Sequence, residues 1–222
     1  MIKHFIFFCF YDINLKEICK WNNKRNNKNE KLALVGRTGS GKTTIVNLLC
    51  GFYEPVKGEI KINGEDYLKY SISSIRKRIG YVMQEIHIIE GTIADNIRYV
   101  NKNITDEEIQ NIFKKLNLHD KIMRLKDGYN TNISNNEDIL SLGEKQMINF
   151  ARVMAINCDV VILDEVTSNL SYETEILVNN AIKQVTENKI VIIIAHRLST
   201  IKNCNKIIFM NNGEIEEEGN YN

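Results

Sequence analysis

Residues 36–43, Gly-Arg-Thr-Gly-Ser-Gly-Lys-Thr, restrict the fold most, because they fit the phosphate-binding pattern G-x-x-x-x-G-K-[ST]. We refer to them as the phosphate loop. The apolar residues 31–35 before it predict a buried strand, and residues 44–49 after it predict a helix. The glycines let backbone N–H groups turn toward a phosphate, and the helix N-terminus adds a partial positive charge. This order predicts a nucleoside-triphosphate site; the alternative, a glycine-rich turn without a ligand, would not require the flanking strand and helix.

Length, charge and cysteine content limit the class of protein. The chain has 222 residues, of which 43% are hydrophobic, so we expect a single α/β domain over residues 1–222. The formal charge of +1 gives no basic surface for general nucleic-acid binding. The five cysteines are scattered without a C-x-x-C pair, which predicts neither a disulfide framework nor a zinc site. The apolar run 5–11 is far shorter than the roughly 20 residues of a membrane-spanning helix, so we expect no transmembrane domain in this chain.

The remaining pattern predicts a mainly parallel sheet flanked by helices. Residues 79–83, 160–163 and 189–195 read as buried strands, and residues 171–187 as the helix between the last two. Residues 5–11 predict an edge strand, and Asn63-Gly64 predicts the turn of a small antiparallel hairpin. Capping boxes at residues 105–108 and 141–144 predict helices, so we expect a helical subdomain over about residues 85–157. The fold class is therefore α/β, a P-loop NTPase core with a small antiparallel β subdomain and a helical subdomain.

Polar residues follow several of the predicted strands. Asp164 and Glu165 come directly after residues 160–163, at the sheet edge where α/β folds place their ligands. Asp164 is placed to hold Mg²⁺ through a bound water, and Glu165 to deprotonate an attacking water; a carboxylate cap on the next helix is the alternative. Gln84 and His196 also follow strands and can reach a metal or a γ-phosphate, although either residue is as readily a structural one.

Taken together, these residues resemble the nucleotide-binding domain of an ATP-binding cassette (ABC) transporter over nearly the whole chain. The phosphate loop is similar to that family's Walker A, Gln84 to its Q-loop, residues 140–144 to its LSGGQ signature, residues 160–165 to its Walker B and His196 to its switch histidine. Residues 90–97 and 196–201 further resemble the exporter branch, which handles drugs or lipids.

The resemblance implies an ATPase that binds ATP and Mg²⁺ and drives transmembrane export. It implies a transmembrane domain as partner, a second nucleotide-binding domain in a homo- or heterodimer closing head-to-tail on ATP, and a place on the cytoplasmic face of a membrane. The catalytic residues would be Glu165, His196 and Gln84, and the metal-binding residues Thr43, Gln84 and Asp164. The nucleotide would contact Tyr11 (adenine stacking), Gly36, Arg37, Thr38, Gly39, Ser40, Gly41, Lys42, Thr43, Thr44 and, from the partner chain, Ser141 and Gly143.

The chain departs from the family pattern at the signature and beyond it. Leu142 replaces the first signature glycine, Glu144 the glutamine, and Ser171 the D-loop aspartate. Within residues 132–137 the glutamate and glycines usual in exporters are missing from their family positions, and the one glutamate present is Glu137. Glu144 would bring a negative charge to the phosphate-facing end of its helix. Because glutamine serves in a capping box as well as glutamate, we expect Glu144→Gln to leave stability nearly unchanged.

Two other classes compete with an export ATPase. A DNA-repair or chromosome-maintenance ATPase of the same superfamily would carry a long coiled coil between residues 43 and 141, and no sustained heptads occur there. A nucleotide-binding interaction module, or a degenerate transporter remnant with little turnover, remains open because of the altered signature.

Overall fold

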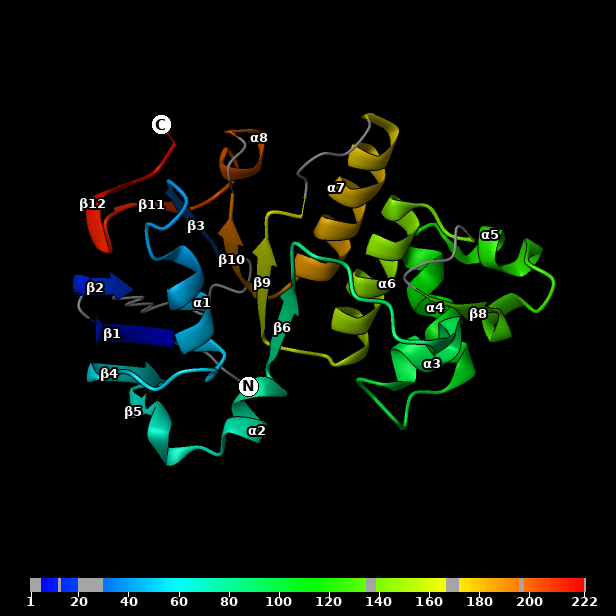
Figure 1. The fold of residues 1–222 in the computed structure, drawn as a ribbon, viewed down its shortest axis with the longest axis horizontal. Coiled ribbons are helices and arrows are strands. Elements are labelled where there is room, and N and C mark those ends of the chain that lie inside the picture. Colours follow the sequence, from blue (N-terminus) through cyan, green and yellow to red (C-terminus); the bar gives the residue numbers. More distant parts are fainter. Residues whose placement is uncertain are drawn as a thin grey trace. The chain divides into compact units, whose positions relative to one another are not determined.

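The structure is a computed structural model that describes residues 5–11, 13–19, 30–134, 139–166, 172–195 and 198–221. The chain divides into two compact units (Figure 1). The first unit comprises Met1–Gly80, Asp159–Glu165 and Asn188–Asn222, and the second comprises Tyr81–Cys158 and Val166–Glu187. Each unit is described by itself.

The central sheet has the strand order β12-β11-β3-β10-β9-β6. Its strands are β3 (Lys31–Gly36), β6 (Ile79–Val82), β9 (Val160–Asp164), β10 (Ile190–Ile194), β11 (Lys206–Asn211) and β12 (Glu214–Gly219). Strand β10 pairs in parallel with β3 and β9, and β3 pairs in parallel with β11. The four residues before Asp164 in β9 and all of β10 are buried, as expected for β-branched strands of a parallel sheet. The predicted α/β fold class is confirmed.

A four-stranded sheet of order β2-β1-β4-β5 completes the strands of the first unit. It contains β1 (Phe5–Tyr11), β2 (Ile13–Cys19), β4 (Lys57–Ile62) and β5 (Glu65–Asp66). The predicted Asn63-Gly64 turn is confirmed: both residues have positive φ, 55° and 87°, between the antiparallel strands β4 and β5. The edge-strand prediction for residues 5–11 was wrong, because β1 pairs with β2 on one side and β4 on the other.

Helices α1 (Lys42–Leu49), α2 (Ile72–Arg76) and α8 (Leu198–Ile201) and the 3-10 helix η1 (Tyr67–Lys69) also belong to the first unit. The Arg76 guanidinium, from α2, donates to the carbonyl oxygens of Cys50 and Gly51 at 3.1 and 2.8 Å. It also lies 4.8 Å from the centroid of the Phe52 ring. The C-terminal end of α1 is thereby fixed to α2.

The second unit is mainly helical. It contains β7 (Gly91–Thr92), α3 (Ile93–Arg98), α4 (Asp106–Lys115), α5 (His119–Arg124), η2 (Gly128–Asn130), β8 (Asn132–Ile133), α6 (Leu142–Ala155) and α7 (Tyr172–Thr186). Helices α6 and α7 lie side by side in Figure 1 and pack against each other. The core of the unit is built around Met147, Ile148, Phe150 and Ala151 of α6, all fully buried. Within the described ranges, no helix is long and apolar enough to cross a membrane.

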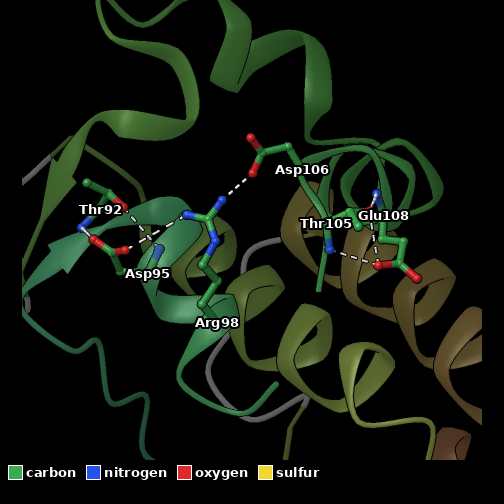
Figure 2. A network of polar contacts seen from close by, with 6 residues as sticks. All are labelled: Thr92, Asp95, Arg98, Thr105, Asp106 and Glu108. Atoms are coloured by element: carbon green, nitrogen blue, oxygen red, sulfur yellow. Dashed lines mark hydrogen bonds and ion pairs between the residues drawn. The ribbon is translucent and has the colours of Figure 1, made fainter. Parts of the chain in front are cut away.

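Three helices of the second unit begin with a capping box. The boxes pair Thr92 with Asp95, Thr105 with Glu108 and Ser141 with Glu144, of which the last two were predicted. Figure 2 shows the Arg98 side chain between the first two boxes, where it forms ion pairs with Asp95 and with Asp106 of α4. The starts of α3 and α4 are thus joined by side chains as well as by the chain.

Candidate functional site

The phosphate loop joins β3 to α1 in the first unit, and its glycines adopt conformations closed to most other residues. Gly39 and Gly41 have φ of 82° and 102°. At Gly36, an added Cβ would lie 2.2 Å from the carbonyl oxygen of Met210 and 2.7 Å from Ser40 Oγ. The backbone path of the loop therefore favours glycine at three positions, the two glycines of the pattern and Gly39 between them.

The Lys42 side chain is buried and turns back into the phosphate loop. Its Nζ atom donates to the carbonyl oxygens of Gly36 and Arg37, at 2.7 and 2.9 Å, and lies 3.4 Å from Ser40 Oγ. Only 6% of Lys42 is exposed to solvent. Burial lowers the pKa of Lys42, and the negative charges of Glu165 and Asp164 oppose that shift. The ammonium is therefore held inside the loop and close enough to both carboxylates to feel their charge.

The order of the parallel strands explains why Asp164 and Glu165 belong to the same sheet as the strand that leads into the phosphate loop. Asp164 ends β9 and pairs in register with Ile194 of β10, and β10 lies next to β3, which leads into the phosphate loop. The Glu165 N–H continues this ladder by donating to the Ile194 carbonyl at 3.1 Å. Glu165 has a φ of 48°, which costs a residue with a Cβ about 1 kcal/mol. Such local strain at a chemically active side chain is typical of functional sites.

The start of α1 suits an anion. Its N-cap is Gly41, and no acidic residue lies in its first turn. Thr43, the second residue of the helix, is exposed, and Thr44 is half-buried. Arg37, Thr38 and Gly39, on the rim of the loop, are exposed too. Backbone N–H groups, a buried ammonium and an accessible hydroxyl fit a bound triphosphate with a hard metal ion.

Metal binding at this place would use few protein ligands. Among the described residues there is no group of three or more His, Cys, Asp or Glu able to hold a metal ion. A hydroxyl, one or two carboxylates and the oxygens of the nucleotide itself are the usual ligands of Mg²⁺ beside a phosphate. Thr43 and Asp164 have the right chemistry for that role.

The signature-like segment lies in the second unit, where Ser141 is the N-cap of α6. The Ser141 N–H donates to Glu144 Oε2 at 2.9 Å, and the Glu144 N–H donates to Ser141 Oγ at 3.4 Å. Leu142 is 60% exposed. A Cβ on Gly143 would lie 2.4 Å from Thr174 Cγ2, so this glycine is needed where α6 approaches α7. Its presence therefore has a packing reason independent of any nucleotide.

The structure gives a reason to revise the expectation that Glu144→Gln leaves stability nearly unchanged. Lys121, on α5, donates from Nζ to Glu144 Oε1 at 2.5 Å. Burial would raise the pKa of Glu144, but the hydrogen bonds from Lys121 and Ser141 outweigh it and hold the pKa below its usual value. Glu144 is thus a helix cap and one half of an ion pair, and its charge at the start of α6 is already partly neutralised.

The other predicted site residues are distributed as follows. Gln84 is exposed just after β6 and belongs to the second unit. Tyr11 is the last residue of β1, in the same unit as the phosphate loop. His196 and Ser171 lie outside the described residues, as do residues 135–137. The structure therefore brings together Lys42, Asp164 and Glu165 within one unit.

Sequence reasoning missed the contribution of the β11–β12 hairpin. The Met210 carbonyl lies against Gly36, and the Gly213 N–H donates to the Ser40 carbonyl at 3.1 Å. The signal was present in the sequence, because Asn212-Gly213 is the same turn dipeptide as Asn63-Gly64.

Comparison with known proteins gives consistent matches. A family model described as "ABC transporter" matches residues 23–168. The uncharacterized ABC transporter ATP-binding protein YfiC of Bacillus subtilis is 41% identical over 192 residues, which are 86% of this chain and 32% of that protein. An ATP-dependent lipid A-core flippase of Francisella novicida is 37% identical over 193 residues, again 86% of this chain and 32% of the relative.

The fold is also similar to that of a solved structure. A bacterial Atm1-family ABC exporter with ATP bound superimposes with a TM-score of 0.78 and 34% sequence identity, over 86% of this chain and 34% of that one. The chain spans about a third of the length of the relatives it matches.

Proposed function

Because the chain belongs to the ABC transporter family, whose model matches residues 23–168, we propose that it is the ATP-binding and ATP-hydrolysing part of an ABC exporter. The observation that carries the proposal is the buried Lys42 ammonium, held in the phosphate loop and acted on by the charges of Glu165 and Asp164. The exporter branch is supported by the relatives, which include a lipid A-core flippase and a probable multidrug resistance transporter. We take residues 1–222 as one ATP-binding cassette whose helical subdomain covers about residues 85–157.

Binding of ATP would use the phosphate loop and the start of α1. The N–H groups around Gly39 and Gly41 and the Lys42 ammonium bind phosphate oxygens, while Arg37, Thr38 and Thr44 line the rim. The Lys42 ammonium has three N–H donors, so it can donate to a phosphate oxygen in addition to the carbonyl oxygens of the loop. Tyr11 is assigned to stacking on adenine.

Hydrolysis would use the end of β9. Mg²⁺, when bound, neutralises the phosphate oxygens and orients the γ-phosphate; Thr43, Asp164 and Gln84 are the residues that would hold it. Glu165, which follows β9 with a φ of 48°, would accept the proton of the attacking water. Through the family resemblance, His196 is assigned a hydrogen bond to the γ-phosphate.

The transport cycle would require partners. Ser141 and Gly143, at the start of α6, would face the γ-phosphate bound by a second nucleotide-binding domain in a head-to-tail dimer. A transmembrane domain would complete the exporter and hold the cassette at the cytoplasmic face of the membrane. The relatives named above are about three times as long as the matched segment, which leaves room for such a domain in them.

A second function is favoured by the start of α6. Leu142 is 60% exposed at a family glycine position. A leucine side chain there weakens the case for tight closure over a partner's phosphate, whereas the pairing of Glu144 with Lys121 lessens the repulsion between that carboxylate and the phosphate. The chain would then be an ATP-binding interaction module with little turnover.

One assay separates the two functions. Magnesium-dependent ATP hydrolysis is measured for the wild-type chain, for Glu165→Gln and for Lys42→Ala, each alone and with a transmembrane domain. An export ATPase shows turnover that both substitutions abolish, with ATP binding retained in Glu165→Gln. Binding of ATP without Glu165-dependent hydrolysis under every condition identifies the interaction module.

A further inference from the structure

The first unit contains two hairpins with the same turn. Asn63-Gly64 joins β4 to β5 with φ of 55° and 87°, and Asn212-Gly213 joins β11 to β12 with φ of 48° and 82°. Gly64 is exposed, and a Cβ added to it would meet nothing within 4 Å. Gly213 instead donates its N–H to the carbonyl of Ser40 in the phosphate loop, at 3.1 Å. Two turns of equal sequence and conformation therefore differ in what they contact.

The β11–β12 hairpin meets the phosphate loop at two points. Met210 pairs in register with Gly36, and its carbonyl oxygen occupies the place that a Cβ of Gly36 would need. Gly213 holds Ser40, which is only 3% exposed. The first residue and the fifth residue of the loop thus rest on the same hairpin.

The hydrogen bond to Ser40 has a geometric consequence for the next residue. A trans peptide is planar, and its C=O and N–H point in opposite directions. When the Ser40 carbonyl points at Gly213, the Gly41 N–H of the same peptide must point away from the hairpin. Gly41 is the N-cap of α1 and has a φ of 102°, so its N–H belongs to the group that a phosphate at the helix start would contact.

We propose that the Asn212-Gly213 turn is a positioning element for the phosphate loop, in which the Gly213 N–H fixes the Ser40–Gly41 peptide so that the Gly41 N–H is presented to a phosphate. This proposal rests on the proposed ATP site. The hairpin does not touch the nucleotide itself. It acts by holding one peptide of the loop in its binding orientation before ATP arrives, which lowers the cost of ordering the site.

Matched glycine substitutions test the role of the turn. Gly213→Ala and Gly64→Ala place the same side chain at nearly the same positive φ, but Gly213 is buried and Gly64 is exposed. Thermal unfolding of both variants is therefore measured first, so that a loss of stability is told apart from a loss of ATP affinity. Calorimetric titration of the full chain with ATP and Mg²⁺ should show a dissociation constant raised roughly three- to tenfold for Gly213→Ala and less than about twofold for Gly64→Ala.

A backbone substitution removes the N–H without adding a side chain, and so stays informative if Gly213→Ala does not fold. Cys204 is a natural ligation site, so residues 204–222 can be synthesised with glycolic acid in place of Gly213 and joined to residues 1–203. The ester protein should bind ATP more weakly than the ligated all-amide protein by a similar factor. Equal affinity of the two proteins would overturn the proposal, as would an equal loss in Gly64→Ala.

Lys42→Ala distinguishes a failure of this proposal from a failure of the proposed ATP site on which it rests. If Lys42→Ala also leaves the affinity for ATP unchanged, the ATP site itself is wrong. If Lys42→Ala weakens binding and the ester does not, the site stands and only the role of the hairpin fails.

Discussion

The Nζ atom of Lys121, on α5, donates a 2.5 Å hydrogen bond to Oε1 of Glu144, on the first turn of α6. The two side chains are 48% and 15% exposed, so the pair is partly shielded from water. Glu144 also accepts from the Ser141 N–H, and it therefore joins the start of α6 to α5.

We expect Glu144→Gln to lower the free energy of unfolding by about 1 kcal/mol at pH 7, because the cap survives but the ion pair does not. The pKa of Glu144 is held below its usual value, so the stabilisation is present above the pKa of an unfolded glutamate, about 4.3, and is lost as the pH falls through the lower pKa of the folded protein. Urea denaturation of both proteins from pH 7 down to about pH 3 measures the difference. A double-mutant cycle with Lys121→Met isolates the pair; a coupling energy near zero would show that the contact is incidental.

Lys42→Ala should weaken ATP binding by at least ~1.5–3 kcal/mol, because it removes a charge-assisted hydrogen bond to phosphate. Titration calorimetry with ATP and Mg²⁺ measures the loss. Lys69→Ala, at an exposed lysine of the same unit, is the matched control and should bind as the wild type does. Equal affinities for the two variants would remove Lys42 from the nucleotide site.

Two replacements of Glu165 should distinguish its role in ATP hydrolysis from the conformational strain of its backbone. Glu165→Gln keeps the shape of the side chain but removes the base, so ATP binding should remain and hydrolysis should cease. Glu165→Gly should also be inactive, yet more stable than Glu165→Gln by roughly 1 kcal/mol, because glycine adopts a φ of 48° without strain. Thermal unfolding without nucleotide compares the two variants. A glycine variant that is the less stable one would contradict the claim of strain at this residue.

The network of Figure 2 should show two kinds of contribution to stability. Arg98→Ala removes exposed ion pairs to Asp95 and Asp106 and should cost at most about 1 kcal/mol, an effect that fades in high salt. Thr105→Ala removes the hydroxyl that accepts from the Glu108 N–H and donates to the Glu108 carboxylate; since no ion pair is lost, it should cost about 1 kcal/mol with little dependence on salt. Urea denaturation in low and high sodium chloride distinguishes them. The same salt dependence in both variants would contradict this division.

The fold follows from the sequence wherever short-range patterns decide it. Strand β3, the phosphate loop and α1 were predicted from residues 31–49, and the Ser141–Glu144 cap from its spacing. The Asn63-Gly64 turn was recognised because an alternating strand precedes it. The equivalent Asn212-Gly213 turn was missed although its signal is the same, and recognising it would have predicted β11 and β12.

What the sequence did not reveal depends on contacts between distant residues. Lys121 and Glu144 are separated by 23 positions, and no local pattern indicates that they pair. The position of β1 inside its sheet required recognising β2, whose residues 13–19 mix polar and apolar side chains without a clear strand pattern. The carbonyl of Met210 against Gly36 depends on the register of two parallel strands, which sequence periodicity does not fix.

Strand β3 lies between β10 and β11 in the sheet, so it cannot pair with either neighbour until that neighbour has been synthesised. Both neighbours of β3 are made long after it, since β10 begins at Ile190 and β11 at Lys206. The second unit consists of residues 81–158 and 166–187, so on the ribosome its chain is complete while β3 still lacks both partners. During that interval the apolar residues Leu32, Ala33 and Leu34 and two open strand edges remain exposed to chaperones and to other nascent chains. The phosphate loop can therefore take its final form only after Met210 and Gly213, which contact its residues Gly36 and Ser40, have been made.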